Sequence, residues 1–191
     1  MIDKPLVAIA GIGSVNVVDI PVDNDARVDV ARLRTALLER LEREQAVYMV
    51  VAIIGSTEEG AVDSLSDIVD LRDEMRQKGL SFVIHADAAW GGYFASMIRR
   101  ETPPGKSPIF KDGRDFVPHV GLRDSTRKQL EQLVEADSIT IDPHKSGYIP
   151  YPAGALCYRD GRQRYLLTWT APYINQSSSV ESIGLYGVEG R

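Results

Sequence analysis

Cysteine is nearly absent from this sequence, which carries a single one, Cys157, among 191 residues. One cysteine excludes a disulfide within the chain and is typical of a reducing compartment. Because Cys157 lies in an apolar run, we expect it to be a core residue. Long apolar runs are absent too: none approaches the roughly 20 residues of a membrane-spanning helix, and the first residues do not resemble a signal peptide. The sequence therefore predicts a cytoplasmic location and no membrane partner.

Positive charge is scarce relative to negative charge. The chain has 22 Lys and Arg against 27 Asp and Glu, which gives a formal net charge of -5, and it has no run of basic residues. This balance argues against nucleic acid and anionic membranes as partners. Hydrophobic residues make up 43% of the composition, and a chain of this length can build a real core. We expect a globular protein without internal repeats.

Short β-branched or apolar runs alternate with amphipathic segments along the chain. Strands are predicted over residues 15–22, 47–54, 82–86, 138–141 and 155–158. Helices are predicted after Asp29 as an N-cap, after Ser64 with Asp67 as a capping box, and over residues 125–135. Residues 101–118, rich in proline, predict a long surface loop. The alternation predicts an α/β fold whose mostly parallel sheet is flanked by helices.

Polar residues follow three of the predicted strands at the point where each strand ends. These groups are Gly55-Ser56-Thr57, His85-Ala86-Asp87 and Asp142-Pro143-His144-Lys145. In sheets of this type ligands bind beyond the carboxyl ends of the strands. We therefore expect these carboxylates, imidazoles, hydroxyls and the amine to converge on one edge of the sheet.

A lysine and a carboxylate on neighbouring strand ends suit a Schiff-base enzyme. Pyridoxal phosphate forms an imine with a lysine, exchanges it for the substrate amine, and accepts into its ring the electrons released at Cα. The ring is a good electron sink when an aspartate keeps its nitrogen protonated. These requirements predict Lys145 as the imine lysine, Asp87 beside the ring nitrogen, Ala89 under the flat ring, and Thr57 as a hydroxyl for the ring or the substrate carboxylate.

Two blocks, HADAAWGG at residues 85–92 and ADSITIDPHKSGYIPYPAGAL at residues 136–156, resemble the group II pyridoxal-phosphate-dependent amino-acid decarboxylases of fold type I. The resemblance implies an aspartate-aminotransferase-like large domain. It implies catalytic roles for Lys145, Asp87 and His144, and a cofactor site made of Lys145, Asp87, Ala89, Thr57, His144 and Asp142. His144 would contact the cofactor phosphate or the substrate side. The wording SGYIPYPAGALCYRDG with APYINQ is most similar to tyrosine decarboxylases, which implies L-tyrosine as the substrate and carbon dioxide and the amine as products.

The resemblance covers nearly the whole chain but only the middle of the family's length. Residues 1–191 are thus expected to be a partial pyridoxal-phosphate-binding large domain, without the family's N-terminal segment and C-terminal small domain. The upstream segment carries the phosphate-binding turn and the histidine that stacks on the cofactor, so we expect weak cofactor binding and impaired activity. Family members are homodimers, which implies self-association here.

Other functions are compatible with the same residues. His85, Asp87, Asp142 and His144 could ligate a divalent metal for hydrolysis, although this leaves Lys145 without a purpose. A second alternative is a catalytically inactive relative that acts as a dimerisation or regulatory module. A third is another activity of the same fold, such as aminotransfer, because that chemistry also uses the aspartate and the lysine.

Overall fold

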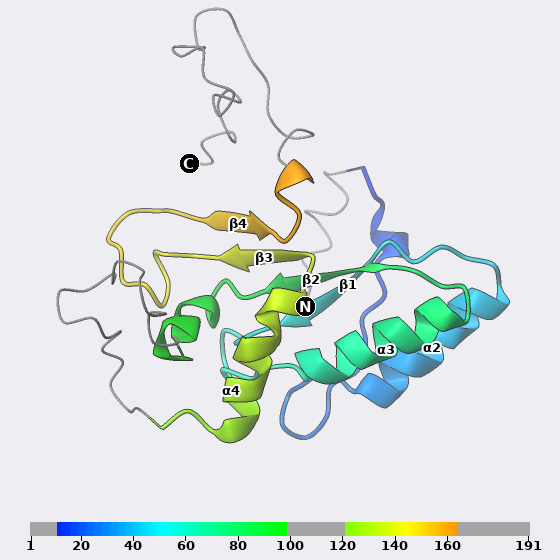
Figure 1. Ribbon diagram of the computed structural model, residues 1–191, viewed down its shortest axis with the longest axis horizontal. Helices are drawn as coiled ribbons and strands as arrows, with labels where there is room; N and C mark the ends of the chain where they lie inside the picture. Colours follow the sequence, from blue (N-terminus) through cyan, green and yellow to red (C-terminus); the bar gives the residue numbers. More distant parts are fainter. Residues whose placement is uncertain (1–10, 99–120, 164–191) are drawn as a thin grey trace, which may run out of the picture.

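The computed structural model describes residues 11–98 and 121–163, and within them the chain forms a layer of helices on a sheet (Figure 1). Four strands of the described residues make up the sheet, in the order β1 (Met49–Ile53), β2 (Val83–Asp87), β3 (Ser138–Ile141) and β4 (Ala155–Tyr158). The first three are parallel, and β4 runs antiparallel to β3. The predicted mostly parallel α/β sheet is confirmed.

Three α-helices of the described chain pack against the sheet: α2 (Val30–Glu42), α3 (Leu65–Gln77) and α4 (Asp124–Glu131). Helix α2 begins as predicted, because the Asp29 carboxylate accepts a hydrogen bond from the Arg32 amide at 3.0 Å. Helix α3 also begins where expected, but the Ser64 side chain makes no capping hydrogen bond, so the predicted capping box is wrong. The helix predicted over 125–135 is α4 continued by the 3-10 helix η3 (Gln132–Glu135).

The core lies between the helices and one face of the sheet. Its fully buried members include Ile54, Leu65, Ile68, Met75 and Ile84. Side chains alternate between the two faces of a strand, so Ile84 and Ala86 of β2 are buried while His85 and Asp87 lie on the opposite face. This alternation places the two polar residues of β2 on the same side of the sheet.

Two buried ionic groups connect the helices to the strands. Arg72 of α3 is 4% exposed and pairs at 3.2 Å with Asp137, which also accepts a hydrogen bond from the Ile84 amide at 2.8 Å. The carboxylate of Asp63 accepts hydrogen bonds at 2.7 Å from the amides of Val28 and Ile53. Burial raises the pKa of Asp63, and the two backbone hydrogen bonds oppose this rise.

Two expectations about the outer parts of the fold are wrong. Residues 15–22 do not form a strand: Ser14–Asn16 form the 3-10 helix η1, and Val22 makes only an isolated bridge to Val28. A β-branched run becomes a strand only when another strand lies beside it, and Val22 pairs with a residue of its own turn. Cys157 lies in β4 as predicted but is exposed, because no described helix covers it there.

The loop predicted over 101–118 lies outside the described residues. In the described part of the chain, none of the helices combines the length and the apolar character that crossing a bilayer requires.

Candidate active site

Asp87 is the last residue of β2 and lies at the carboxyl edge of the parallel strands. It is in register with Ile53 of β1 and Thr140 of β3, and its carbonyl accepts a hydrogen bond from the Ile54 amide at 2.8 Å. Its half-buried carboxylate accepts a hydrogen bond from the Ala89 amide at 3.2 Å. The backbone and a local turn thus fix Asp87 where the sequence predicts a ligand site.

Lys145 lies in a turn that follows β3 at the same edge. The Asp142 amide donates to the Ala89 carbonyl at 3.2 Å, and the Lys145 amide donates to the Asp142 carbonyl at 3.0 Å. The hydroxyl of Ser146 donates to the Trp90 carbonyl. The turn that carries Lys145 is therefore bonded directly to the turn that follows Asp87.

The amine of Lys145 forms an ion pair with a nearby carboxylate. Its Nζ lies 2.8 Å from Oδ2 of Asp142 and 5.9 Å from the centroid of the Trp90 ring. The Lys145 side chain is 29% exposed and that of Asp142 16% exposed. Within the described residues Asp87 and Lys145 form no ion pair with each other: Lys145 pairs with Asp142, and Asp87 accepts from the Ala89 amide.

Glycine at position 91 permits the close approach of β1 to the turn after Asp87. The Gly91 amide donates to the Ile54 carbonyl at 2.9 Å. A Cβ atom at position 91 would lie 2.1 Å from that carbonyl oxygen, which is far inside contact distance. Any larger residue would therefore separate the end of β1 from the turn that carries Ala89.

Of the six predicted site residues, the structure joins Asp87, Ala89, Asp142 and Lys145 through hydrogen bonds or an ion pair. Thr57 is exposed in the loop after β1 and makes no hydrogen bond to these residues within the described chain. The exposed His144 turns its Nδ1 toward the backbone of Ala153, 2.5 Å from the carbonyl oxygen.

His85 makes two contacts that sequence reasoning missed, because it was considered only as a polar residue of the sheet edge and as a metal ligand. Its Nδ1 lies 2.8 Å from Oγ of Ser138, and its Nε2 lies 3.0 Å from Oγ1 of Thr140. Burial lowers the pKa of His85, and the charge of Asp87 opposes this shift. The matching spacing of His85-x-Asp87 and Ser138-x-Thr140 on neighbouring strands is the signal that could have found it. No cluster of three or more His, Cys, Asp or Glu in the described ranges is placed to hold a metal ion.

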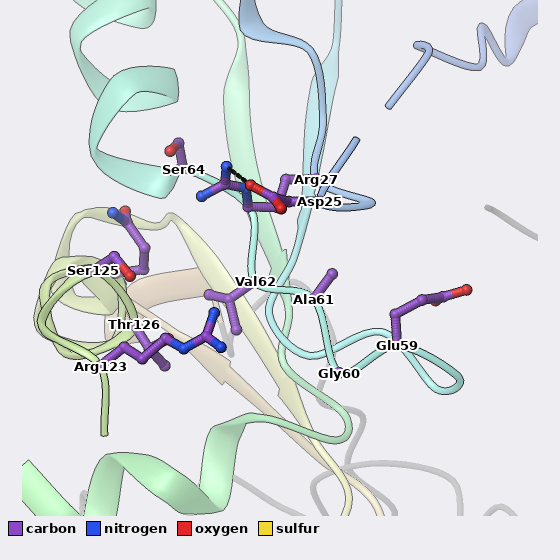
Figure 2. A pocket seen from close by; sticks show the side chains of 11 residues that line it. Asp25, Arg27, Glu59, Gly60, Ala61, Val62, Ser64, Arg123, Ser125 and Thr126 are labelled. Carbon is purple, nitrogen blue, oxygen red and sulfur yellow. Dashed lines mark hydrogen bonds and ion pairs between the residues drawn. The ribbon is translucent and has the colours of Figure 1, made fainter. Parts of the chain in front are cut away.

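A separate hollow of about 210 Å³ lies between the start of α4, the loop after β1 and the turn before α2 (Figure 2). Its polar lining includes Arg27, which is paired with Asp25 at 2.6 Å, and Arg123 and Thr126 of the α4 end. None of the six predicted site residues lines it. The hollow is therefore distinct from the edge where Asp87 and Lys145 lie.

Comparison with known proteins agrees with this arrangement. Residues 6–104, just over half of the chain, match the pyridoxal-dependent decarboxylase conserved domain. The chain is 34% identical over 189 residues to an L-tyrosine decarboxylase of Enterococcus faecium, covering 95% of this chain and 31% of that protein. It is 34% identical to a probable L-tyrosine/L-aspartate decarboxylase of Methanopyrus kandleri, covering 83% of this chain and 34% of that protein. The chain thus spans about a third of the length of these relatives.

Solved structures share the fold. The crystal structure of Oryza sativa TDC with PLP and tryptamine superposes with a TM-score of 0.63 at 20% identity, covering 91% of this chain and 30% of that one. The apo form of mouse CSAD gives a TM-score of 0.61 at 22% identity, covering 94% of this chain and 31% of that one. The resemblance carried by residues 85–92 and 136–156 is confirmed, and the chain belongs to the pyridoxal-dependent decarboxylase family.

Proposed function

We propose that this chain supplies the cofactor-binding core of a pyridoxal-phosphate-dependent amino-acid decarboxylase, and that its substrate is L-tyrosine. The observation that carries the proposal is the bonded pair of turns at the sheet edge. These turns hold Asp87 at the end of β2 and Lys145 after β3, joined through the hydrogen bond between Asp142 and Ala89. On this proposal, residues 1–191 are part of the family's large domain.

The residues at the edge fit the chemistry of this cofactor. Lys145 offers a primary amine for the cofactor aldehyde, and Asp87 offers a carboxylate for a protonated ring nitrogen. Ala89, half-buried and held by Asp87, has a side chain small enough to lie against a planar ring. When bound, pyridoxal phosphate supplies an electron-accepting ring that takes up the electrons of the bond broken at Cα.

Each side chain of the edge then has a defined task. Lys145 anchors the cofactor covalently, and Asp142 orients its amine before the cofactor arrives, as their 2.8 Å ion pair suggests. Asp87 holds the proton on the ring nitrogen by charge and hydrogen bonding. We assign Thr57 and His144 to the rim of the cofactor, because both are exposed in the loops that follow β1 and β3 at this edge.

The relatives favour an aromatic substrate. The decarboxylases of Enterococcus faecium and Levilactobacillus brevis, at 34% and 31% identity, are described as acting on L-tyrosine. L-Aspartate is the competing substrate, because the relative from Aliivibrio fischeri, at 26% identity, is an aspartate 1-decarboxylase. We further propose that the protein is cytoplasmic and acts as a homodimer, which size-exclusion chromatography with light scattering would test.

The experiment is to purify the chain with pyridoxal phosphate and record the yellow absorbance that the cofactor acquires when bonded to a lysine. Borohydride reduction followed by peptide mass spectrometry then identifies the labelled residue. We expect the label on Lys145, its loss in Lys145→Ala, and its retention in Lys128→Ala, which removes an exposed lysine of α4. Release of carbon dioxide from L-tyrosine in preference to L-aspartate tests the substrate. Absence of the absorbance, or a label on another lysine, contradicts the proposal.

A further inference from the structure

A polar cluster of His85, Ser138 and Thr140 lies between β2 and β3, on the face of the sheet that also carries Asp87. The imidazole bridges the two hydroxyls, with Nδ1 at 2.8 Å from Ser138 and Nε2 at 3.0 Å from Thr140. His85 is half-buried and Ser138 is 8% exposed. Both ring nitrogens are thus occupied by the neighbouring strand.

The register of the two strands gives this bridge its direction. His85 is in register with Ser138, and Asp87 is in register with Thr140. The ring therefore reaches forward along β3 to the residue that lies beside Asp87. Thr140 in turn precedes Asp142, whose carboxylate pairs with Lys145, by two residues.

A neutral His85 ring can hydrogen-bond to both hydroxyls of the cluster at once. A neutral imidazole has one donor and one acceptor, and a hydroxyl can supply the complement of either. Burial lowers the pKa of His85, which favours this neutral ring, although the nearby Asp87 acts in the opposite direction. The residue of β1 in register with His85 is Val51, which carries no charge.

We propose that His85 is a positioning residue of the cofactor site. Its ring fixes the end of β3 against the end of β2, so that Asp87 and Lys145 keep the spacing that the cofactor requires. Thr140 is its essential partner, because it is the hydroxyl nearest to Asp87 in register. This inference rests on the proposed function.

The test measures the affinity of the full chain for pyridoxal phosphate and the absorbance spectrum of the bound cofactor in four single variants and in the double variant of His85→Phe with Thr140→Val. His85→Phe keeps a ring and removes both hydrogen bonds, whereas His85→Gln retains a donor and an acceptor. Thr140→Val removes the forward partner alone. Val51→Ala is the matched control, since it removes side-chain packing beside His85 without touching either hydrogen bond. Denaturant unfolding without cofactor reports the stability of each variant.

We expect Thr140→Val to bind the cofactor about tenfold more weakly, the weight of one hydrogen bond. His85→Phe should bind it at least as weakly, and both variants should shift the absorbance maximum. The double variant should be no worse than His85→Phe, because both substitutions break the same bridge. His85→Gln should recover most of the affinity, and Val51→Ala should lose stability while keeping the affinity and the spectrum of the parent chain.

Two results would overturn the inference. If His85→Phe and Thr140→Val lose stability but keep the parent affinity and spectrum, the cluster only supports the fold. If Val51→Ala weakens cofactor binding as much as His85→Phe does, general packing explains the effect. Failure of the proposed function is distinguishable, because the unmutated chain would then show no covalent cofactor before any His85 variant is measured.

Discussion

Substitution of Gly91 by alanine tests how closely the end of β1 approaches the turn after Asp87. The new Cβ would lie 2.1 Å from the carbonyl oxygen of Ile54, whereas real Cβ atoms essentially never come closer than 3.0 Å to another heavy atom. The backbone must therefore open by about 0.9 Å. The backbone fixes the position of the Cβ, and its partner is a main-chain oxygen, so no side-chain rotation can relieve this contact.

The magnitude follows from two costs. Forcing extra volume into a packed site costs about 1–3 kcal/mol, and opening the backbone also weakens the hydrogen bond from the Gly91 amide to the Ile54 carbonyl, worth about 1 kcal/mol. We expect Gly91→Ala to lower the free energy of unfolding by about 2–4 kcal/mol. This is a large part of the about 5–15 kcal/mol that holds an ordinary domain together.

Urea unfolding followed by circular dichroism measures the effect. Gly161→Ala is the matched control, because its new Cβ would meet no atom within 4 Å, and we expect it to change the stability by less than about 0.5 kcal/mol. Gly91→Ala should also weaken binding of pyridoxal phosphate, since the displaced turn carries Ala89. Equal stabilities of Gly91→Ala and the parent chain would refute the close approach of β1 to this turn.

Three further predictions follow from the buried groups. Because burial raises the pKa of Asp63 above 3.8, the carboxyl keeps its proton to higher pH in the folded state than in the unfolded state. The free energy of unfolding of the parent chain, relative to that of Asp63→Asn, should therefore fall as the pH rises above 3.8. Unfolding curves with the opposite pH dependence would contradict this prediction. Arg72→Ala should cost about 2 kcal/mol in urea unfolding, because it removes a buried side chain that bonds Asp137 and the Glu135 carbonyl, although Asp137 keeps its ion pair with Arg159 at 2.5 Å. Arg76→Ala, which breaks a pair 59% and 57% exposed, should cost less than about 1 kcal/mol. Similar costs for the two variants would contradict this prediction. Burial lowers the pKa of His85, so the free energy of unfolding of the parent chain should decrease as the pH falls below 6.5. The same decrease in His85→Gln would show that another group causes it.

The features that could be predicted from the sequence depend on local chemistry. The β-branched run at 138–141 predicts a strand with the bounds observed, and Asp29 caps α2 through its own side chain. The run at 15–22 has the same β-branched composition but no strand beside it in the described chain. The prediction that Cys157 is buried was wrong for a similar reason, because burial depends on what covers β4 rather than on the strand's own residues.

In the candidate site, too, some features could be predicted from the sequence and others could not. The position of Asp87 and Lys145 followed from the rule that parallel strands end at one edge, and the structure places their turns in direct contact. The ion pair between Lys145 and Asp142 depends on the conformation of a turn, which the sequence does not determine. The hydrogen bonds of His85 depend on the register of β2 against β3, so their spacing signal can be used only once that register is known.

Nitrogen-15 NMR of the bound cofactor tests the central claim most directly. It reports whether the ring nitrogen is protonated, as expected if Asp87 lies beside it while Lys145 is bonded to the cofactor aldehyde. With pyridoxal phosphate labelled at that nitrogen, the parent chain should show the chemical shift of a protonated ring. Asp87→Ala should show the unprotonated shift while mass spectrometry still finds the cofactor on Lys145. An unprotonated ring in the parent chain, or the same shift in both proteins, would contradict the account.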